Sequence, residues 1–233
     1  MNISGFQKFT LIDYPGKIAC TLFLHGCNFR CGFCHNPELV LIPPKESYSK
    51  KEILDFLMKR KEQLGGVCFT GGEPLMTIEE DFLREIKNLG YNIKIDTNGS
   101  FPHLLEELIG SNLIDYVAMD IKSSPKNYQK ITNSNIDVSK IEESIKIISN
   151  LLNYEFRTTI LEDFHTKEEM IEMAKWLNEL CGKKPKKFSL QGFKNHGKFI
   201  DSSFNKKKNT REEYLQELKE VLEPYFEEIK IKV

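Results

Sequence analysis

Three cysteines stand within eight residues of one another near the start of the chain, in the segment HGCNFRCGFCHNPE. Cys27, Cys31 and Cys34 have the spacing C-x3-C-x2-C. Structural zinc takes four ligands, usually in two pairs; no second pair stands at that spacing, although His25 and His35 could be proposed as ligands. Three thiolates from one loop suit a cubane iron–sulfur cluster, which normally has four cysteine ligands. The missing fourth ligand would leave one iron open to an amine and a carboxylate of a substrate or cofactor.

The composition favours a globular protein in a reducing compartment. The 233 residues are 40% hydrophobic and 29% charged with a net charge of −1, which argues against a disordered chain and against a strongly basic nucleic-acid-binding protein. The N-terminus lacks the pattern of a signal peptide, and no segment approaches the roughly 18 apolar residues of a membrane span. We therefore expect a cytoplasmic protein that binds neither nucleic acid nor membrane. Its isolated Cys20, Cys68 and Cys181 are expected to fill space as thiols.

Six short apolar runs are typical of buried strands. They begin at Ile18, at Gly65 or Gly66, and at Tyr91, Asp115, Tyr154 and Lys186. Segments with helical spacing lie between them, which indicates parallel strands joined by right-handed crossovers. Six such units are too few for a closed eight-fold barrel, so an open partial barrel and a doubly wound sheet are both possible. The final EIKIKV alternates as a short terminal strand would.

Capping residues predict where several helices begin. Thr166 with Glu169, and Thr210 with Glu213, match the capping-box pattern. Asp137 is expected to cap a helix with a core-facing stripe. That stripe consists of Val138, Ile141, Ile145, Ile148 and Leu152.

Unusual polar residues fall at the carboxyl ends of the predicted strands. The cysteine loop follows the first strand, TGGEP the second, DTNG the third and DIK the fourth, while Arg157 lies in the fifth and Gln191 ends the sixth. Ligands of parallel α/β folds bind at these ends of the strands. We therefore expect these residues to converge on one rim. The longest irregular stretch, residues 194–209, is expected to present its lysine run to solvent or to act as a lid.

The cysteine loop with its aromatic Phe33, followed by GGEP at residues 71–74, resembles the radical S-adenosylmethionine superfamily. Within that superfamily, GFQKFTLIDYPGKIACTLFLHGCNFRCGFCHNPEL, TGGEPL, DTNG and DIK resemble the glycyl-radical-enzyme activating proteins, above all those of anaerobic (class III) ribonucleoside-triphosphate reductase. The resemblance implies an α/β fold, a partial (β/α)6 TIM-like barrel of parallel strands with outer helices. It implies a single radical SAM domain over residues 1–233, with a core at about 17–192 and a C-terminal helix and strand at 210–233. The segment KFTLIDYPGK would pack, cover the cluster or meet the partner.

The resemblance also implies the cofactors and the reaction. One [4Fe-4S] cluster would bind Cys27, Cys31 and Cys34, and S-adenosyl-L-methionine would chelate the fourth iron. Reductive cleavage would give a 5′-deoxyadenosyl radical that takes a hydrogen atom from a glycine of the partner enzyme. The expected protein is thus a radical SAM oxidoreductase that activates a glycyl radical enzyme, foremost anaerobic ribonucleoside-triphosphate reductase. Because only one cluster is expected, flavodoxin or ferredoxin would supply electrons.

Two alternatives remain open at this point. A radical SAM enzyme could act on another glycyl radical enzyme or on a small molecule, as a relative of 7-carboxy-7-deazaguanine synthase would. A structural zinc or simple electron-transfer protein belongs to a different class. The lack of a fourth cysteine and the presence of GGEP count against that last class.

The same resemblance assigns a set of cofactor-binding residues along the rim: Phe33, His35, Asn36, Gly71, Gly72, Glu73, Asp96, Asn98, Asp120, Lys122, Arg157 and Gln191. Gly71 and Gly72 would let the backbone approach the methionyl ammonium, and Glu73 would accept from it or fix the loop. Lys122 and Arg157 would offer positive charge to the carboxylate or ribose.

Two of these assignments carry further expectations. Phe33 would stack near the adenine, or pack under the loop. The resemblance implies that Asp96, Thr97 and Asp120 hold a monovalent cation beside the methionyl carboxylate. Gln191 stands where one relative has a histidine and cannot titrate, so acid–base chemistry is in doubt there.

Overall fold

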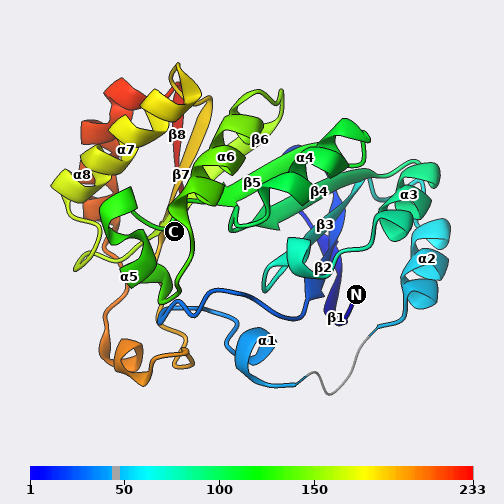
Figure 1. Cartoon of the computed structure of the whole chain (residues 1–233). Helices are drawn as coiled ribbons and strands as arrows, with labels where there is room; N and C mark the ends of the chain where they lie inside the picture. Colours follow the sequence, from blue (N-terminus) through cyan, green and yellow to red (C-terminus); the bar gives the residue numbers. More distant parts are fainter. Residues whose placement is uncertain (44–47, 233) are drawn as a thin grey trace. The chain divides into compact units, whose positions relative to one another are not determined.

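The structure is a computed structural model that describes residues 1–43 and 48–232. Its strands are β1 (Ile3–Thr10), β2 (Ala19–Leu24), β3 (Gly66–Gly71), β4 (Asn92–Thr97), β5 (Tyr116–Asp120), β6 (Tyr154–Ile160), β7 (Lys187–Gly192) and β8 (Glu228–Lys232). Its α-helices are α1 (Glu38–Leu41), α2 (Lys50–Lys59), α3 (Glu80–Asn88), α4 (Pro102–Gly110), α5 (Tyr128–Thr132), α6 (Val138–Ser149), α7 (Lys167–Cys181) and α8 (Glu212–Leu222). Strands and helices alternate along most of the chain (Figure 1).

The strands form an open sheet in the order β1 to β8. The pairs β2–β3, β3–β4, β6–β7 and β7–β8 are parallel, and β1 alone among the described pairings runs antiparallel to its neighbour. The predicted α/β class with an open parallel sheet is confirmed. The six predicted strands correspond to β2 through β7, and the terminal alternation forms β8, although its last residue lies outside the described residues. Strand β1 was not predicted, because Gly5 interrupts the alternation of apolar and polar residues in its sequence. Its pairing with β2 is also interrupted, by two register shifts.

The chain divides into two compact units. Unit 1 comprises Met1–Asn28, Asn36–Thr97 and His103–Val117, and unit 2 comprises Phe29–His35, Asn98–Pro102 and Ala118–Val233. The single-domain organisation stays a prediction. No helix in the described part of the chain is both long and apolar enough to span a membrane.

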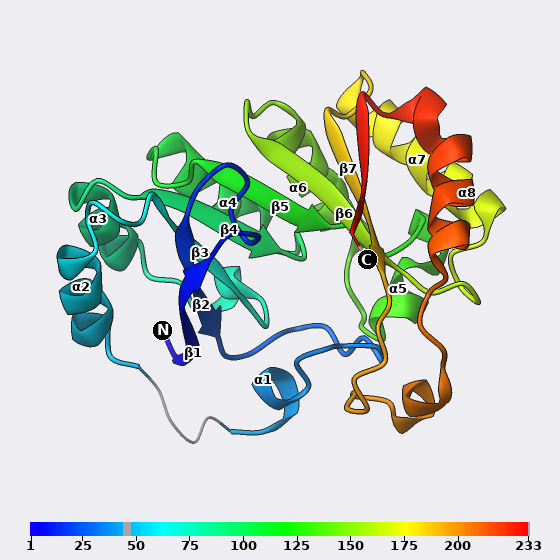
Figure 2. The same cartoon turned by 180° about the vertical axis from the view of Figure 1, so that it is seen from behind.

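In unit 1, helices α2 and α3 lie side by side against the parallel strands (Figures 1 and 2). Ser49 and Glu52 form a capping box at the start of α2, which satisfies backbone donors that the helix leaves open. Phe69 of β3 meets Phe82 of α3 edge to face, with ring centroids 6.3 Å apart, and both rings are fully buried. This packing fixes one face of β3 and directs alternate side chains, such as Cys68, to the other face.

The segment before β2 packs against the N-terminal ends of β2 and β3. Tyr14 is buried, and its ring lies so close to Gly66 that a Cβ there would come within 2.7 Å of it. The Thr21 hydroxyl donates to Asp13 at 2.6 Å. These contacts show packing for Asp13 and Tyr14, whereas Leu11 and Ile12 of the same segment are exposed. Cover of the cluster and contact with the partner stay predictions.

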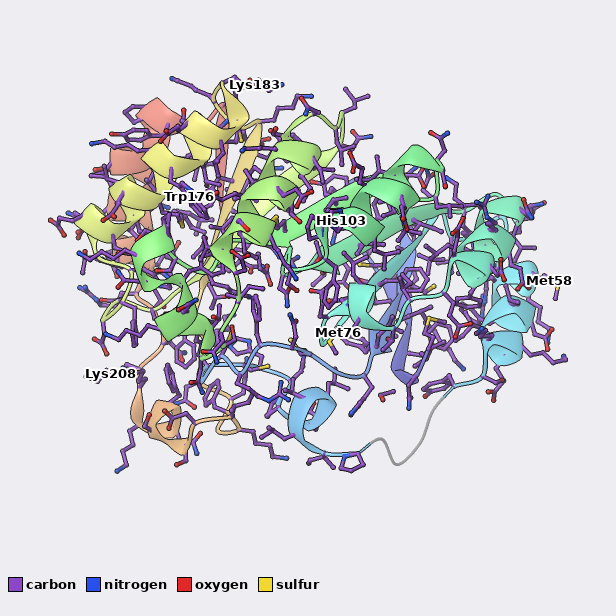
Figure 3. The ribbon with its side chains drawn as sticks, in the orientation of Figure 1. Met58, Met76, His103, Trp176, Lys183 and Lys208 are labelled. Carbon is purple, nitrogen blue, oxygen red and sulfur yellow. The ribbon has the colours of Figure 1, made fainter. Side chains whose placement is uncertain are left out.

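In unit 2, helices α6, α7 and α8 lie in a row. Trp176 of α7, labelled in Figure 3, donates from its indole to Glu142 of α6 at 3.1 Å. Asp137 caps α6 as predicted, accepting from the Ser139 backbone at 3.0 Å. The inclusion of Leu152 in the core-facing stripe was wrong, because α6 ends at Ser149 and Leu152 is 80% exposed.

The two predicted capping boxes have different outcomes. Thr166 does cap α7, accepting from the Glu169 backbone, but the Glu169 carboxylate binds elsewhere. Thr210 does not cap α8, since the N-cap is Arg211. The Thr210 hydroxyl instead donates to the Ile160 carbonyl at 2.6 Å, which ties the segment before α8 to the end of β6.

Candidate active site

The cysteine loop is anchored through its backbone on both sides. In unit 1 the amide of Gly26, next to Cys27, donates to the Leu39 carbonyl at 2.8 Å. In unit 2 the amide of Cys34 donates to the carbonyl of Cys31 at 3.0 Å, and Arg30 donates to the Thr132 carbonyl at 2.9 Å. These bonds hold a short loop whose side chains can turn toward a bound group.

The three thiols are the donor set that an iron–sulfur cluster with one open iron would need. Burial raises the pKa of Cys31 to about 11, with Lys122 acting in the opposite direction. Across residues 1–43 and 48–232, no three Cys, His, Asp or Glu side chains gather closely enough to hold one ion. In an iron–sulfur cubane each thiolate ligates a different iron, so the sulfurs need not converge on one point. The donor set of Cys27, Cys31 and Cys34 therefore suits an iron–sulfur group.

The GGE turn is bonded directly to the start of the cysteine loop within unit 1. The Glu73 amide donates to the Gly26 carbonyl at 2.7 Å, and the Gly72 amide donates to the Leu24 carbonyl at 2.9 Å. A Cβ on Gly72 would lie 1.9 Å from the Gly26 oxygen, so only glycine fits this approach. Gly71 has a φ of +116°, which L side chains rarely adopt.

The Glu73 carboxylate is fully buried and fixes this turn. It accepts from the Leu75 amide at 3.0 Å and from the Thr97 hydroxyl at 2.8 Å. Glu73 thus joins the end of β3 to the end of β4. Of its two predicted roles, fixing the loop is the one that these bonds describe, while contact with the methionyl ammonium stays a prediction.

Asp96 lies beside a buried lysine that the sequence reading did not single out. Lys94 of β4 forms an ion pair with Asp96 two residues later, and their side chains are 2% and 12% exposed. The Lys94 ammonium also lies 3.7 Å from the Cys68 sulfur of β3. The signal was available, because residues two apart in a strand share a face and IKID places Lys94 next to Asp96.

Asp120, Lys122 and Arg157 form one charge cluster in unit 2, with Asp120 and Lys122 at the end of β5 and Arg157 inside β6. Asp120 pairs with Lys122 at 2.9 Å and with the Arg157 guanidinium. Burial alone would raise the pKa of Asp120, but Arg157 and Lys122 together hold it well below its usual range. Burial likewise disfavours charge on Lys122, yet Asp120 keeps its pKa raised. The cluster is therefore fully charged at neutral pH, and one carboxylate is shared by two cations.

Two further residues of unit 2 hold the backbone that carries Lys122. His165 accepts from the Leu161 amide through Nδ1 at 2.9 Å, so its Nε2–H donates to the Lys122 carbonyl at 2.9 Å. Glu169 accepts from the Ser123 hydroxyl at 2.5 Å and the Ser124 amide at 2.8 Å. Neither residue was predicted as part of the site, because their contacts join segments about 40 residues apart.

The remaining predicted residues occupy varied settings. Phe33 is buried against Phe204, with ring centroids 6.1 Å apart, so it does pack under the loop. The exposed ring of His35 meets Phe193 at 5.9 Å and His196 at 5.3 Å.

Three other predicted positions are fixed by backbone or local contacts. The Asn36 carbonyl accepts from Leu39 at 3.1 Å. The buried Asn98 side chain accepts from the Ser100 amide at 2.9 Å. Gln191 pairs with Thr159 near the end of β7. Cofactor binding by Asn36, Asn98 and Gln191 stays a prediction.

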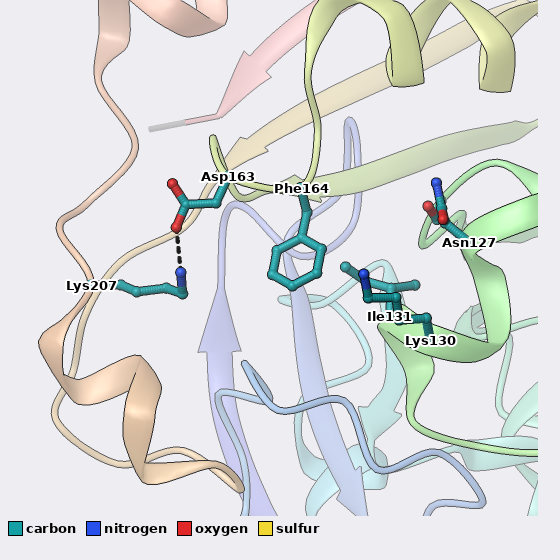
Figure 4. Close-up of a pocket in the computed structure, with 7 residues that line it drawn as sticks. Asn127, Lys130, Ile131, Asp163, Phe164 and Lys207 are labelled. Atoms are coloured by element: carbon teal, nitrogen blue, oxygen red, sulfur yellow. Dashed lines mark hydrogen bonds and ion pairs between the residues drawn. The ribbon is translucent and has the colours of Figure 1, made fainter.

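Three neighbouring cavities of unit 2 border the segment 194–209, and one of them also borders the cysteine loop. Their volumes are about 440, 390 and 300 Å³. Figure 4 shows the largest, where Phe164 stands between Lys130 and the Lys207–Asp163 ion pair. The smallest is lined by Gly32 and Phe33 of the cysteine loop itself. The basic side chains that line the three cavities, here called the basic face, are Arg30, Lys130, Lys206, Lys207, Lys208 and Arg211.

Comparisons with known proteins show the family of the chain. Residues 21–177 match the family described as the Radical SAM superfamily. MJ1227 of Methanocaldococcus jannaschii, named as a candidate glycyl-radical enzyme activating enzyme, is 33% identical over 99% of this chain and 95% of its own length. The pyruvate formate-lyase-activating enzyme of Clostridium pasteurianum is 34% identical over 52% of each chain, so the match spans about half of that protein.

A solved structure supports the fold. The radical SAM methyltransferase of Sphaerobacter thermophilus superposes with a TM-score of 0.67 over 94% of this chain and 67% of its own, at 12% identity. At that identity the likeness concerns the fold alone.

Proposed function

Because the chain belongs to the Radical SAM superfamily and, within it, to the glycyl-radical enzyme activating enzymes, we propose that it generates the glycyl radical of anaerobic ribonucleoside-triphosphate reductase. The observation that carries the site is the bond between the GGE turn and the cysteine loop, Glu73 N–H to the Gly26 carbonyl at 2.7 Å. It joins the GGE turn to the first residues of the cysteine loop within unit 1, which supports the proposal. The choice of the reductase rests on the resemblance of the motifs around Cys27 and Asp96.

The residues of the chain divide the work of holding the cofactors. Cys27, Cys31 and Cys34 would hold a [4Fe-4S] cluster, and the glycines of the GGE turn would let the backbone approach the amino-acid end of S-adenosylmethionine. When bound, the cluster and S-adenosylmethionine together supply a reductively generated organic radical. Lys122 and Arg157 would orient the carboxylate or ribose of S-adenosylmethionine through charge-assisted hydrogen bonds.

A second candidate substrate is another glycyl radical enzyme. The identity to a pyruvate formate-lyase-activating enzyme over half of the chain favours it. The two candidates differ only in the partner protein, so one experiment with both partners separates them.

The test is an anaerobic assay of the reconstituted protein with dithionite and S-adenosylmethionine. We expect 5′-deoxyadenosine, and a glycyl radical EPR doublet on the anaerobic reductase but not on pyruvate formate-lyase. Cys31→Ala should abolish cleavage, whereas the matched control Cys181→Ala should retain it. A doublet on pyruvate formate-lyase alone would replace the proposed partner, and cleavage without a doublet on either would point to a small-molecule substrate.

We also propose that the basic face receives an acidic electron-transfer protein, a flavodoxin or ferredoxin. Six basic and three acidic side chains line its cavities, whereas the whole chain has a net charge of −1. Two of those lining residues, Gly32 and Phe33, lie in sequence between Cys31 and Cys34. Charge complementarity next to the cluster loop would steer an acidic donor to the point where electrons enter.

A further inference from the structure

Lys94 is buried in the middle of β4, where a charged side chain is rarely found without a partner. Its ammonium pairs with Asp96 on the same face of the strand. It also lies 3.7 Å from the sulfur of Cys68, its register partner in β3, and that sulfur lies 3.9 Å from the Asp96 carboxylate. The positive charge is thus held against Asp96 by contacts from two adjacent strands.

The groups that would hold a monovalent cation are already engaged by other groups. Asp96 pairs with Lys94, and the Thr97 hydroxyl donates to Glu73 at 2.8 Å. Asp120 pairs with Lys122 and Arg157. An added cation at Asp96 would stand beside the Lys94 ammonium, where like charges in a poorly hydrated setting repel. These residues therefore do not fit a bound metal cation.

We propose that Lys94 is a built-in cation, whose ammonium supplies at Asp96 the charge that a free sodium or potassium ion would otherwise supply. The enzyme then works without any monovalent metal cation. The inference rests on the proposed function, because the place of Asp96 beside S-adenosylmethionine comes from that family. The ammonium is a suitable substitute, since it is a compact single charge with three donors.

The first test compares the wild-type reconstituted protein in tetramethylammonium chloride with the same protein in potassium or sodium chloride at equal ionic strength. We expect the same Tm and the same rate of 5′-deoxyadenosine formation in all three salts. A bound cation at saturating concentration would instead raise Tm by about 5 °C or more. Such a rise, or cleavage that requires potassium or sodium, would overturn the proposal.

The second test uses Lys94→Met, which keeps the length of the side chain and removes its charge. We expect Tm to fall by about 10 °C in tetramethylammonium chloride, because Asp96 loses its buried partner. Potassium or sodium should restore part of that loss. In Lys94→Met/Asp96→Asn the Asp96 carboxylate that attracts the ion is gone, so the dependence of Tm on the salt should vanish. A loss of Tm in Lys94→Met that neither potassium nor sodium restores would count against the proposal.

Lys87→Met is the matched control, because Lys87 also pairs with a carboxylate in unit 1, Asp115, at 2.7 Å but lies on α3. We expect no ion-specific change in it. If Lys94→Met does not fold, the Tm and the cleavage rate of the wild-type protein in the three salts still test the proposal. If no protein cleaves S-adenosylmethionine in any salt, the proposed function fails, while the Tm comparison still tests the role of Lys94.

Discussion

The imidazole of His165 is fully enclosed and uncharged, because burial lowers its pKa from 6.5 despite the carbonyl and carboxylate nearby. A folded-state pKa below the unfolded one means that the unfolded chain binds more protons below about pH 6.5. The stability that His165 contributes is therefore present above that pH and is lost as the pH falls through the lower folded-state pKa.

His165→Gln should show this dependence. The variant should be destabilised at pH 7.5, because Gln reproduces the two hydrogen bonds of the ring poorly. Its deficit relative to wild type should shrink by up to about 1.4 kcal/mol per pH unit below pH 6.5. Urea unfolding of both proteins between pH 5 and 8 measures the difference, and a deficit that stays constant would contradict a neutral buried imidazole.

Gly72 is the residue at which the approach of two loops leaves no room. Gly72→Ala should lower the free energy of unfolding by about 1–3 kcal/mol and reduce the iron retained after reconstitution, because the new Cβ meets the Gly26 carbonyl. Gly110→Ala is its control, since Gly110 ends α4 with nothing within 4 Å of the added Cβ. Equal iron content and equal unfolding midpoints in the two variants would refute the steric argument.

At the scale of elements, the apolar spacing that predicts α6 continues past the end of the helix, so the spacing alone does not predict which side chains are buried. Ile148→Ala should cost about 2–5 kcal/mol, because its side chain is fully buried. Leu152→Ala should change stability by less than about 0.5 kcal/mol, since that side chain is 80% exposed beyond the helix end. Chemical denaturation of the two variants checks this, and a large loss in Leu152→Ala would mean that Leu152 is buried in solution.

Much of the element pattern was predictable, and the exceptions have physical causes. Strands β2, β3 and β5 are largely apolar runs, which is the pattern of strands covered on both faces, whereas β4, β6 and β7 interleave polar and apolar residues. Thr210 was misread because its hydroxyl meets the Ile160 carbonyl, a tertiary contact that no local motif reveals. Within the site, the rim positions of Asp120 and Lys122 followed from the end of a strand. The supports from His165 and Glu169 depend on how α7 docks.

At the scale of the whole molecule, the proposed donor interface predicts that charge reversals on the basic face slow cleavage driven by a protein donor but not cleavage driven by a chemical reductant. Lys130→Glu and Lys207→Glu should slow cleavage driven by reduced flavodoxin roughly tenfold at low salt, because they weaken electrostatic steering. Cleavage driven by dithionite should be unchanged. Lys183→Glu, a charge reversal after α7 and away from the basic face (Figure 3), is the control.

The ratio of the flavodoxin-driven rate to the dithionite-driven rate measures the effect of each variant on donor docking. Loss of dithionite-driven cleavage in Lys130→Glu would show damage to the site rather than to docking. An equal effect of Lys183→Glu would show that total charge, not the basic face, governs the donor.

The two register shifts of β1 bear on how the protein behaves at high concentration. An open sheet has two edges whose backbone groups can pair with another chain and start aggregation. The shifts, at Ile3/Gly5 and Gln7/Thr10, interrupt the regular ladder on one edge, and short β8 carries charged Glu228 and Lys230 on the other. An irregular β1 and a short, charged β8 are each poor templates for pairing with a strand of another copy.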